Sequence, residues 1–151
     1  PLRERLMDLY RTLDTFPEVP GVLRALREAG FATAILSNGS PDMLASAVEG
    51  AGLAGAFDAV ISVDEVGSFK PEPGLFWHAA AALGIAPSAC GVVEDSLPGL
   101  QAGLAAGMEV FSLHPRQGLP AEVAARVHFI DSLQPLQALL STSLFQDHAP
   151  L

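Results

Sequence analysis

Side chains that could bind an anion and a metal ion follow the apolar runs of this sequence. Ser37 and Asn38 follow "FATAIL", Glu94 and Asp95 follow "CGVV", and Lys70 lies in the Gly67-to-Pro73 loop that leads into a predicted helix. A serine hydroxyl and a lysine ammonium are donors suited to an anion such as a phosphate. Two carboxylates suit a hard cation such as Mg²⁺. Together these residue types predict a site for a phosphate group and a metal ion.

The carboxylate pair is the least expected of these features. Glu94 and Asp95 are adjacent, and carboxylates at the end of a buried strand repel each other and resist desolvation. A cation or exposure to water is therefore expected beside them. Helix capping is the alternative explanation, with Asp95 or Ser96 as the N-cap of the helix predicted to follow.

The other polar positions also have structural explanations. Ser37 would satisfy its own turn, as serines after strands often do. Lys70, which precedes Pro71, would be a solvated loop lysine. Structural roles are expected for the remaining candidates, namely Asp64 and Glu65 in an exposed turn or at a helix N-terminus, His78 on the surface or packed, His114 and Arg116 in a rim turn, Cys90 as a small packed residue, and Phe76 and Trp77 in the core.

The elements that must position these residues alternate along the chain. The expected strands are residues 31–37, 57–63, 90–95, 109–113 and 127–130, and the expected helices are residues 21–30, 40–53, 74–85 and 97–108. This alternation over short connections predicts an α/β fold, a doubly wound (Rossmann-like) parallel sheet with helices on both faces. The carboxyl ends of parallel strands share one edge, so the polar residues are expected to meet there.

Composition narrows the possible partners. The 17 acidic and 8 basic residues give a formal net charge of −9, which disfavours binding to nucleic acid or to an anionic membrane surface. The single cysteine, Cys90, excludes an intrachain disulfide and fits a reducing compartment. No apolar stretch approaches the roughly 18 residues of a membrane span, and no signal-peptide pattern opens the chain. We therefore expect a soluble, cytoplasmic protein whose oligomeric state the sequence does not reveal.

Three motifs in order, "ILSNGSP", "FKPEPGLF" and "VVEDSLPGLQAGLAAGM", resemble the haloacid dehalogenase (HAD) superfamily, specifically its phosphatase and β-phosphoglucomutase-like branch. The resemblance covers roughly residues 16–115. It implies that a serine hydrogen-bonds the transferring phosphoryl group, that a lysine neutralises it, and that an acidic pair binds Mg²⁺ directly or through water. The implied site residues are Ser37 and Lys70 as catalytic residues, Ser37, Asn38, Gly39 and Lys70 for substrate, and Glu94 and Asp95 for the metal.

The family's first motif, Asp-x-Asp-x-Thr, supplies the nucleophile and the general acid/base, and it has no good match here. Asp8 and Thr12 have a suggestive spacing, but they follow "RERLM", which is charged and helical in pattern. We therefore expect residues 1–15 to end a cap domain or linker helix, residues 16–142 to form the α/β core, and residues 143–151 to be a tail. On this interpretation the first strand, the nucleophile and most of the cap precede Pro1, and the 151-residue chain alone is inactive.

The resemblance implies an Mg²⁺-dependent phosphatase that hydrolyses a small phosphorylated metabolite through an aspartyl-phosphate intermediate. A mutase of the same branch would use the same residues and differ in its cap. A 2-haloacid dehalogenase is the alternative, because "LSNGSPDML" through "ISVDEVGSFKPEP" is similar to that branch. Those metal-free enzymes carry a Ser-Asn pair where this chain has Glu94 and Asp95. A non-catalytic binding domain with this fold is a further alternative.

Overall fold

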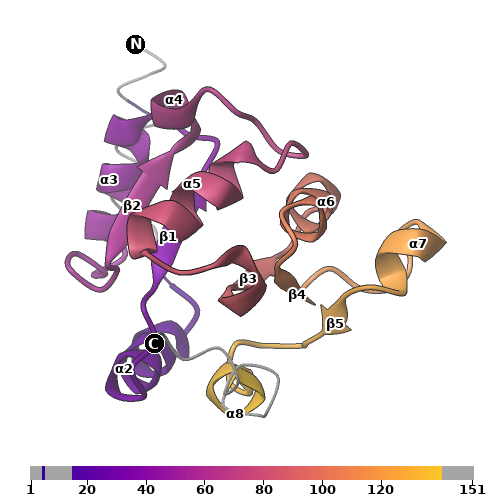
Figure 1. Ribbon diagram of the computed structural model, residues 1–151. Helices are drawn as coiled ribbons and strands as arrows, with labels where there is room; N and C mark the ends of the chain where they lie inside the picture. The colour runs from indigo at the N-terminus through magenta and orange to yellow at the C-terminus, as the bar shows by residue number, and fades with distance from the viewer. Residues whose placement is uncertain (1–4, 6–14, 141–151) are drawn as a thin grey trace.

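The computed structural model describes residue 5 and residues 15–140 (Figure 1). The predicted linker helix, Asp8 and Thr12 included, and the predicted tail therefore lie almost wholly outside the described residues, and those boundaries stay predictions. Within the described part of the chain, no helix is long and apolar enough to cross a membrane.

The strands are parallel, as predicted, and they form two sheets. Strands β1 (Ala34–Ser37) and β2 (Ala59–Ser62) pair with each other. The second sheet has the order β3-β4-β5, comprising Gly91–Glu94, Glu109–Ser112 and His128–Phe129. Among the described residues, β1 and β3 each pair on one side only, so each leaves one edge without a neighbouring strand.

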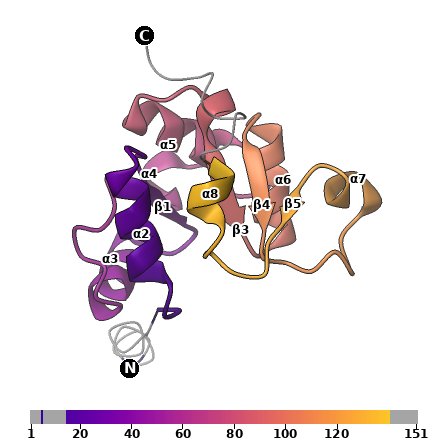
Figure 2. The ribbon, with the colours of Figure 1, turned by 90° about the horizontal axis from the view of Figure 1, so that it is seen from below.

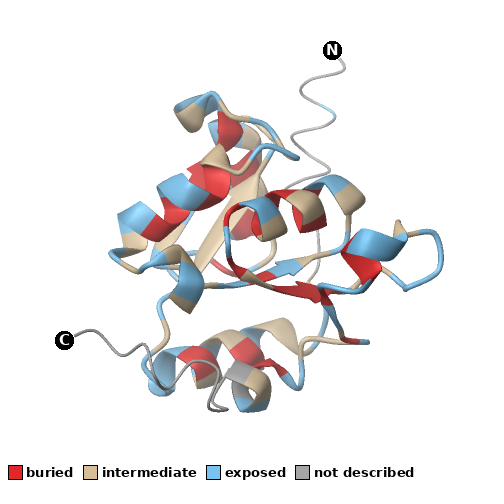
Figure 3. Ribbon diagram, turned by 45° about the vertical axis from the view of Figure 1, so that its right-hand side comes forward, coloured by how far each residue is buried: buried red, intermediate tan, exposed pale blue. Residues whose placement is uncertain are grey.

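Helices cover both faces of the strands. The helices are α2 (Val19–Glu28), α3 (Pro41–Gly50), α4 (Val63–Val66), α5 (Gly74–Leu83), the 3-10 helix η1 (Pro87–Ala89), α6 (Leu97–Ala105), α7 (Ala121–Ala124) and α8 (Leu136–Leu140). Helices α5 and α6 lie on one side of the strands, and α2 and α8 lie side by side on the other (Figures 2 and 3). The four longer helices after residue 18 were predicted from the sequence, whereas α4, η1, α7 and α8 were not.

Alternate strand residues supply the two layers of the core, because successive side chains point to opposite faces of a strand. Leu36 of β1 packs toward α5, and Val92 and Val110 pack with α6. Ile35 packs against the cluster of α3, and Phe111 packs with α2 and α8. This two-sided burial is the arrangement of a doubly wound fold.

Three burial predictions were too simple. Val93 was expected in a buried strand but is 37% exposed, because it points to the opposite face from Val92 in a strand that, among the described residues, has one unpaired edge. Strand β1, which likewise has an unpaired edge among those residues, is half-buried along its length. Trp77 was expected in the core with Phe76, yet it is 50% exposed while Phe76 is 3% exposed. One residue along a helix turns the side chain by about 100°, which moves Trp77 off the buried face.

Local signals at the helix starts hold the site elements in place. Ser40 is the N-cap of α3, as predicted, and its hydroxyl accepts a hydrogen bond from Met43 N at 3.4 Å. Ser96 caps α6 by accepting from Gly99 N at 3.3 Å. A Cβ on Gly103 would lie 2.9 Å from Val110 Cγ2, so glycine permits α6 to pack closely on β4.

Candidate functional site

The predicted polar rim exists at the carboxyl ends of the strands. Ser37 and Glu94 are the last residues of β1 and β3. Each faces a serine in the neighbouring strand, since Ser37 pairs with Ser62 of β2 and Glu94 pairs with Ser112 of β4. The parallel register therefore places four polar side chains at the same end of the two sheets.

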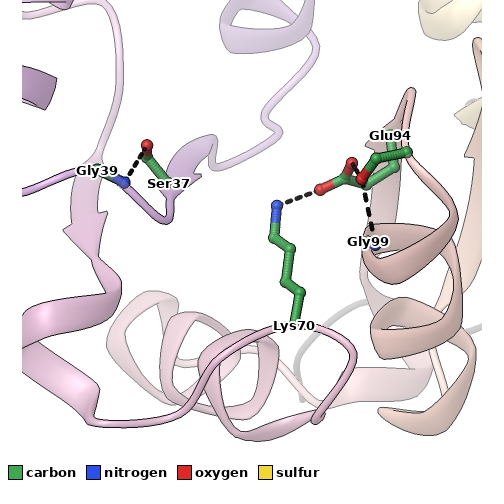
Figure 4. A network of polar contacts seen from close by, with 6 residues as sticks. Ser37, Gly39, Lys70, Glu94 and Gly99 are labelled. Atoms are coloured by element: carbon green, nitrogen blue, oxygen red, sulfur yellow. Dashed lines mark hydrogen bonds and ion pairs between the residues drawn. The ribbon is translucent and has the colours of Figure 1, made fainter.

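Lys70 forms an ion pair with Glu94 through Nζ and Oε1 (Figure 4). The lysine comes from the loop between α4 and α5, and the two side chains are only 11% and 10% exposed. Lys70 is therefore not a solvated loop lysine. Its ammonium is the cation whose presence beside the carboxylates was expected from the sequence, and the buried setting strengthens the attraction between the two charges.

Ser96 and Gly99 are the other two neighbours of the Glu94 carboxylate. Ser96 Oγ donates to Glu94 Oε2 at 3.2 Å while also capping α6. A Cβ placed on Gly99 would overlap the Glu94 carboxyl group, so only glycine lets this carboxylate lie against the first turn of α6. Sequence reasoning missed both contacts, although "EDSLPG" contains both residues.

Asp95 differs from its neighbour. Its side chain is exposed and has no hydrogen bond or ion pair with any described residue. The N-cap of α6 is Ser96, so capping by Asp95 does not explain this carboxylate. Among the described residues, Asp95 is thus an unpaired acid next to the buried Lys70–Glu94 pair.

The loop after β1 holds Ser37, Asn38 and Gly39. Ser37 Oγ accepts a hydrogen bond from Gly39 N at 3.0 Å, so the expected local turn is present. The Ser37 O–H makes no hydrogen bond within the described part of the chain, which leaves its proton available to an anion. Asn38 is exposed and Gly39 is half-buried.

A buried serine that sequence reasoning missed anchors this loop. Ser62 at the end of β2 is fully buried, and its Oγ donates to Gly39 O at 2.7 Å. The Ser62 Oγ also accepts a hydrogen bond from Asp64 N at 3.2 Å and so caps α4. Glu65 completes the capping box of this helix. The serine and the glutamate three residues later in "SVDE" are the sequence signal that would have identified this cap.

The remaining candidates have structural settings. Asp64 and Glu65 are exposed in the first turn of α4, and His78 is exposed on α5. His114 Nδ1 lies 2.7 Å from Pro115 O. Arg116 stacks over the Phe129 ring, with 4.5 Å from Cζ to the ring centroid.

Cys90 also has the setting of a packed residue. It is half-buried against the cluster formed by α6 and β4, and its Sγ lies 3.4 Å from Ala86 O. Burial raises the pKa of the Cys90 thiol above its ordinary value. The neutral thiol is therefore favoured, which is typical of an unreactive cysteine.

The donor set for a metal is small. Among the described residues, no group of three or more His, Cys, Asp or Glu side chains is arranged to hold a metal ion. Glu94 and Asp95 offer two adjacent carboxylates, one of them already engaged with Lys70 and Ser96. Mg²⁺ commonly takes one or two carboxylates and completes its octahedron with water and substrate phosphate. The pair therefore fits part of such a site.

Known proteins resemble this chain over most of its length. It is 37% identical over 141 residues to (S)-2-haloacid dehalogenase 1 of Pseudomonas sp. (strain CBS-3), covering 92% of this chain and 62% of that protein. It is 41% identical over 95 residues to phosphoserine phosphatase of Thermus thermophilus, covering 63% of this chain and 38% of that protein. The chain thus spans less than two thirds of these relatives.

A solved structure extends the likeness to the fold. A HAD family hydrolase from Deinococcus radiodurans R1, with bound phosphate and sodium, superposes with a TM-score of 0.77 at 33% identity, covering 91% of this chain and 64% of that one. The family model of haloacid dehalogenase-like hydrolases matches residues 3–107. With the parallel α/β architecture and the rim of Ser37, Lys70 and Glu94, this match shows that the chain belongs to the haloacid dehalogenase-like hydrolases.

Proposed function

We propose that this chain is part of an Mg²⁺-dependent phosphatase that acts on a small phosphorylated metabolite through an aspartyl-phosphate intermediate. The observation that carries the proposal is the buried Lys70–Glu94 ion pair with the exposed Asp95 beside it, which has no partner in the part of the chain that the structure describes. This arrangement combines a positive charge for a phosphoryl group with carboxylates for a metal. A metal-free reaction would have little use for carboxylates that hold a metal.

Lys70 and Ser37 would bind the phosphoryl group. Figure 4 places Ser37 and Glu94 on opposite sides of the Lys70 side chain. The Ser37 hydroxyl, whose proton has no partner among the described residues, would donate to one phosphoryl oxygen. The Lys70 ammonium would offset the charge on another, and the Glu94 carboxylate keeps that ammonium in place.

Asp95 and Glu94 would hold the metal. When bound, Mg²⁺ would supply positive charge against the phosphoryl oxygens during transfer. The covalent step also needs a carboxylate nucleophile. We propose that this carboxylate comes from a part of the protein outside these 151 residues, which would also select the substrate.

Two of the relatives support phosphoryl chemistry. One is named a phosphoserine phosphatase, and the Deinococcus radiodurans structure contains bound phosphate. A 2-haloacid dehalogenase remains the second candidate, because the Pseudomonas dehalogenase is 37% identical over 92% of this chain. Metal dependence separates the two candidates, since only the first would use Glu94 and Asp95 to hold a metal.

The deciding experiment is a pair of assays on the complete gene product. We expect hydrolysis of p-nitrophenyl phosphate that requires Mg²⁺ and stops with EDTA. Chloride release from 2-chloropropionate that is unaffected by EDTA would instead establish the dehalogenase. Neither activity, together with retained phosphate binding, would favour a binding domain.

Asp95→Asn tests the metal assignment directly. Removing one charged ligand is expected to raise the Mg²⁺ concentration for half-maximal turnover by about tenfold or more. Asp64→Asn is the matched control, because Asp64 is also an exposed acid just beyond a strand end but makes no part of the proposed site. An Asp95→Asn variant with the Mg²⁺ dependence of the unmodified protein would remove Asp95 from the metal site.

A further inference from the structure

The hydroxyl of Ser62 has three properties that an ordinary strand serine lacks. It is fully buried, it donates to Gly39 O at 2.7 Å, and it accepts from Asp64 N at 3.2 Å. The bond to Gly39 joins residues 23 positions apart. The Ser62 hydroxyl therefore acts both as a donor and as an acceptor. The bond that it donates is a tertiary contact.

The two partners of this hydroxyl lead to the two groups that would bind phosphate. Gly39 belongs to the loop whose backbone N–H fixes Ser37 Oγ at 3.0 Å. Asp64 is the second residue of α4, which ends at Val66 with Gly67 as its C-cap at φ 71°, and the next residues form the loop that carries Lys70. A single buried oxygen thus joins the Ser37–Gly39 loop to the first turn of the helix that precedes the Lys70 loop.

We propose that Ser62 is a positioning residue, which sets the Ser37–Gly39 loop and the α4–Lys70 segment relative to each other. This inference rests on the proposed function, because it assumes that Ser37 and Lys70 act on one phosphoryl group. Ser62 itself does not touch the substrate. Alanine at this position would leave Gly39 O without its donor and α4 without its side-chain cap, so both segments would gain freedom.

Ser112 provides a matched control. It is also a fully buried serine at the last position of a strand, and its Oγ donates to the backbone oxygen of His114 at 2.9 Å. That bond spans two residues and closes a local turn, whereas the Ser62 bond reaches another strand–loop unit. Ser62→Ala and Ser112→Ala each remove a hydrogen bond from a buried hydroxyl to a backbone oxygen, but only Ser62→Ala also removes a helix cap and a tertiary contact.

The test compares Ser62→Ala, Ser62→Thr and Ser112→Ala in the complete gene product. For Ser62→Ala we expect kcat for p-nitrophenyl phosphate to fall roughly 10- to 100-fold, with a smaller change in KM, because misplaced groups act mainly in the transition state. Ser62→Thr retains the hydroxyl and is expected to recover most of kcat. Ser112→Ala, which loses one hydrogen bond where Ser62→Ala loses two, is expected to lower the thermal midpoint by less and to retain kcat.

Amide hydrogen exchange gives a readout that does not depend on activity. We expect exchange at residues 38–40 and 64–67 to accelerate in Ser62→Ala and to remain unchanged in Ser112→Ala. Unchanged exchange in Ser62→Ala, or equal losses of kcat in the two alanine variants, would overturn the positioning role. If the unmodified protein hydrolyses no phosphomonoester, the proposed function fails, and exchange still decides whether Ser62 holds both segments.

Discussion

Glu94 is held by three different kinds of contact, which makes it the most constrained side chain of the site. Lys70 binds one carboxylate oxygen, Ser96 donates to the other, and Gly99 leaves the space that the carboxyl group fills. An ion pair, a charge-assisted hydrogen bond and a steric contact each depend on a different property of the partner residue. Single substitutions can therefore separate them.

Gly99→Ala tests the steric contact. Its Cβ would overlap the Glu94 carboxyl group, so we expect lower Mg²⁺-dependent turnover and a loss of about 1–3 kcal/mol in the free energy of unfolding. Gly21→Ala is an unusually close control, because Gly21 is likewise the third residue of a helix and likewise follows proline. Nothing lies within 4 Å of a Cβ there, so we expect stability to be unchanged or slightly higher. Equal effects of the two substitutions would contradict the proposed crowding.

Lys70→Met tests the ion pair. It leaves the Glu94 carboxylate largely buried without its cation, which is expected to cost about 3 kcal/mol in the free energy of unfolding and to reduce turnover strongly. Adding Glu94→Gln should restore much of the stability but not the turnover. Denaturant unfolding and kinetics on both single variants and the double variant measure the coupling. Additive losses of stability would show that the pair is not coupled.

At the scale of elements, strand ends and helix starts carry the site. Helix α6 begins immediately after β3, so the residue that caps the helix, Ser96, also reaches the last residue of the strand, Glu94. Helix α3 begins after β1 with Ser40 as its cap, but within the described part of the chain the Ser40 side chain makes no hydrogen bond besides the cap. In both caps a serine hydroxyl accepts a hydrogen bond from a backbone N–H in the first turn of the helix, but only Ser96 also donates to Glu94.

Ser96→Ala and Ser40→Ala separate these roles. Loss of either cap is expected to lower the free energy of unfolding by about 1 kcal/mol. Only Ser96→Ala also removes a hydrogen bond from Glu94, so we expect its kcat to fall by more than that of Ser40→Ala. Parallel thermal unfolding and steady-state kinetics on the two variants make the comparison. A Ser40→Ala variant with the lower kcat would contradict this assignment.

At the scale of the whole molecule, helix α5 packs against two sheets that, in the described part of the chain, do not pair with each other. Its residues Leu75 and Ala79 pack on β2, while Phe76 and Ala80 belong to the cluster of β3, β4 and α6. Leu36 of β1 packs against both clusters. The cores of the two sheets are therefore continuous through side chains although their backbones are not hydrogen-bonded to each other among the described residues.

Leu36→Ala tests this continuity. We expect a loss of about 2–3 kcal/mol in the free energy of unfolding, because the cavity weakens both clusters. Val60→Ala is the control, since Val60 lies in the adjacent strand but is 41% exposed, and a change within about 0.5 kcal/mol is expected. Denaturant unfolding followed by circular dichroism should show one transition in both variants. Two separate transitions would show that the sheets unfold independently.

Prediction from sequence worked best where neighbours along the chain decide the outcome. Helical periodicity, the Ser40–Pro41 start and the apolar strands gave the main elements and the polar rim. Prediction failed where contacts between segments distant in the sequence decide how far a residue is buried. The exposure of Trp77 and Val93 depends on which faces other elements cover, and short α4 and α7 have too few residues to show a period.

The sequence by itself determined the alternation of elements, the parallel α/β class and the residue types at the strand ends, because these depend on local propensity and on side-chain chemistry. Only the tertiary structure decided the partners. Lys70 meets Glu94 across 24 residues, and Ser62 meets Gly39 across 23. Such pairs form because strand register and helix packing bring separate loops to one edge, and no spacing along the chain encodes that meeting.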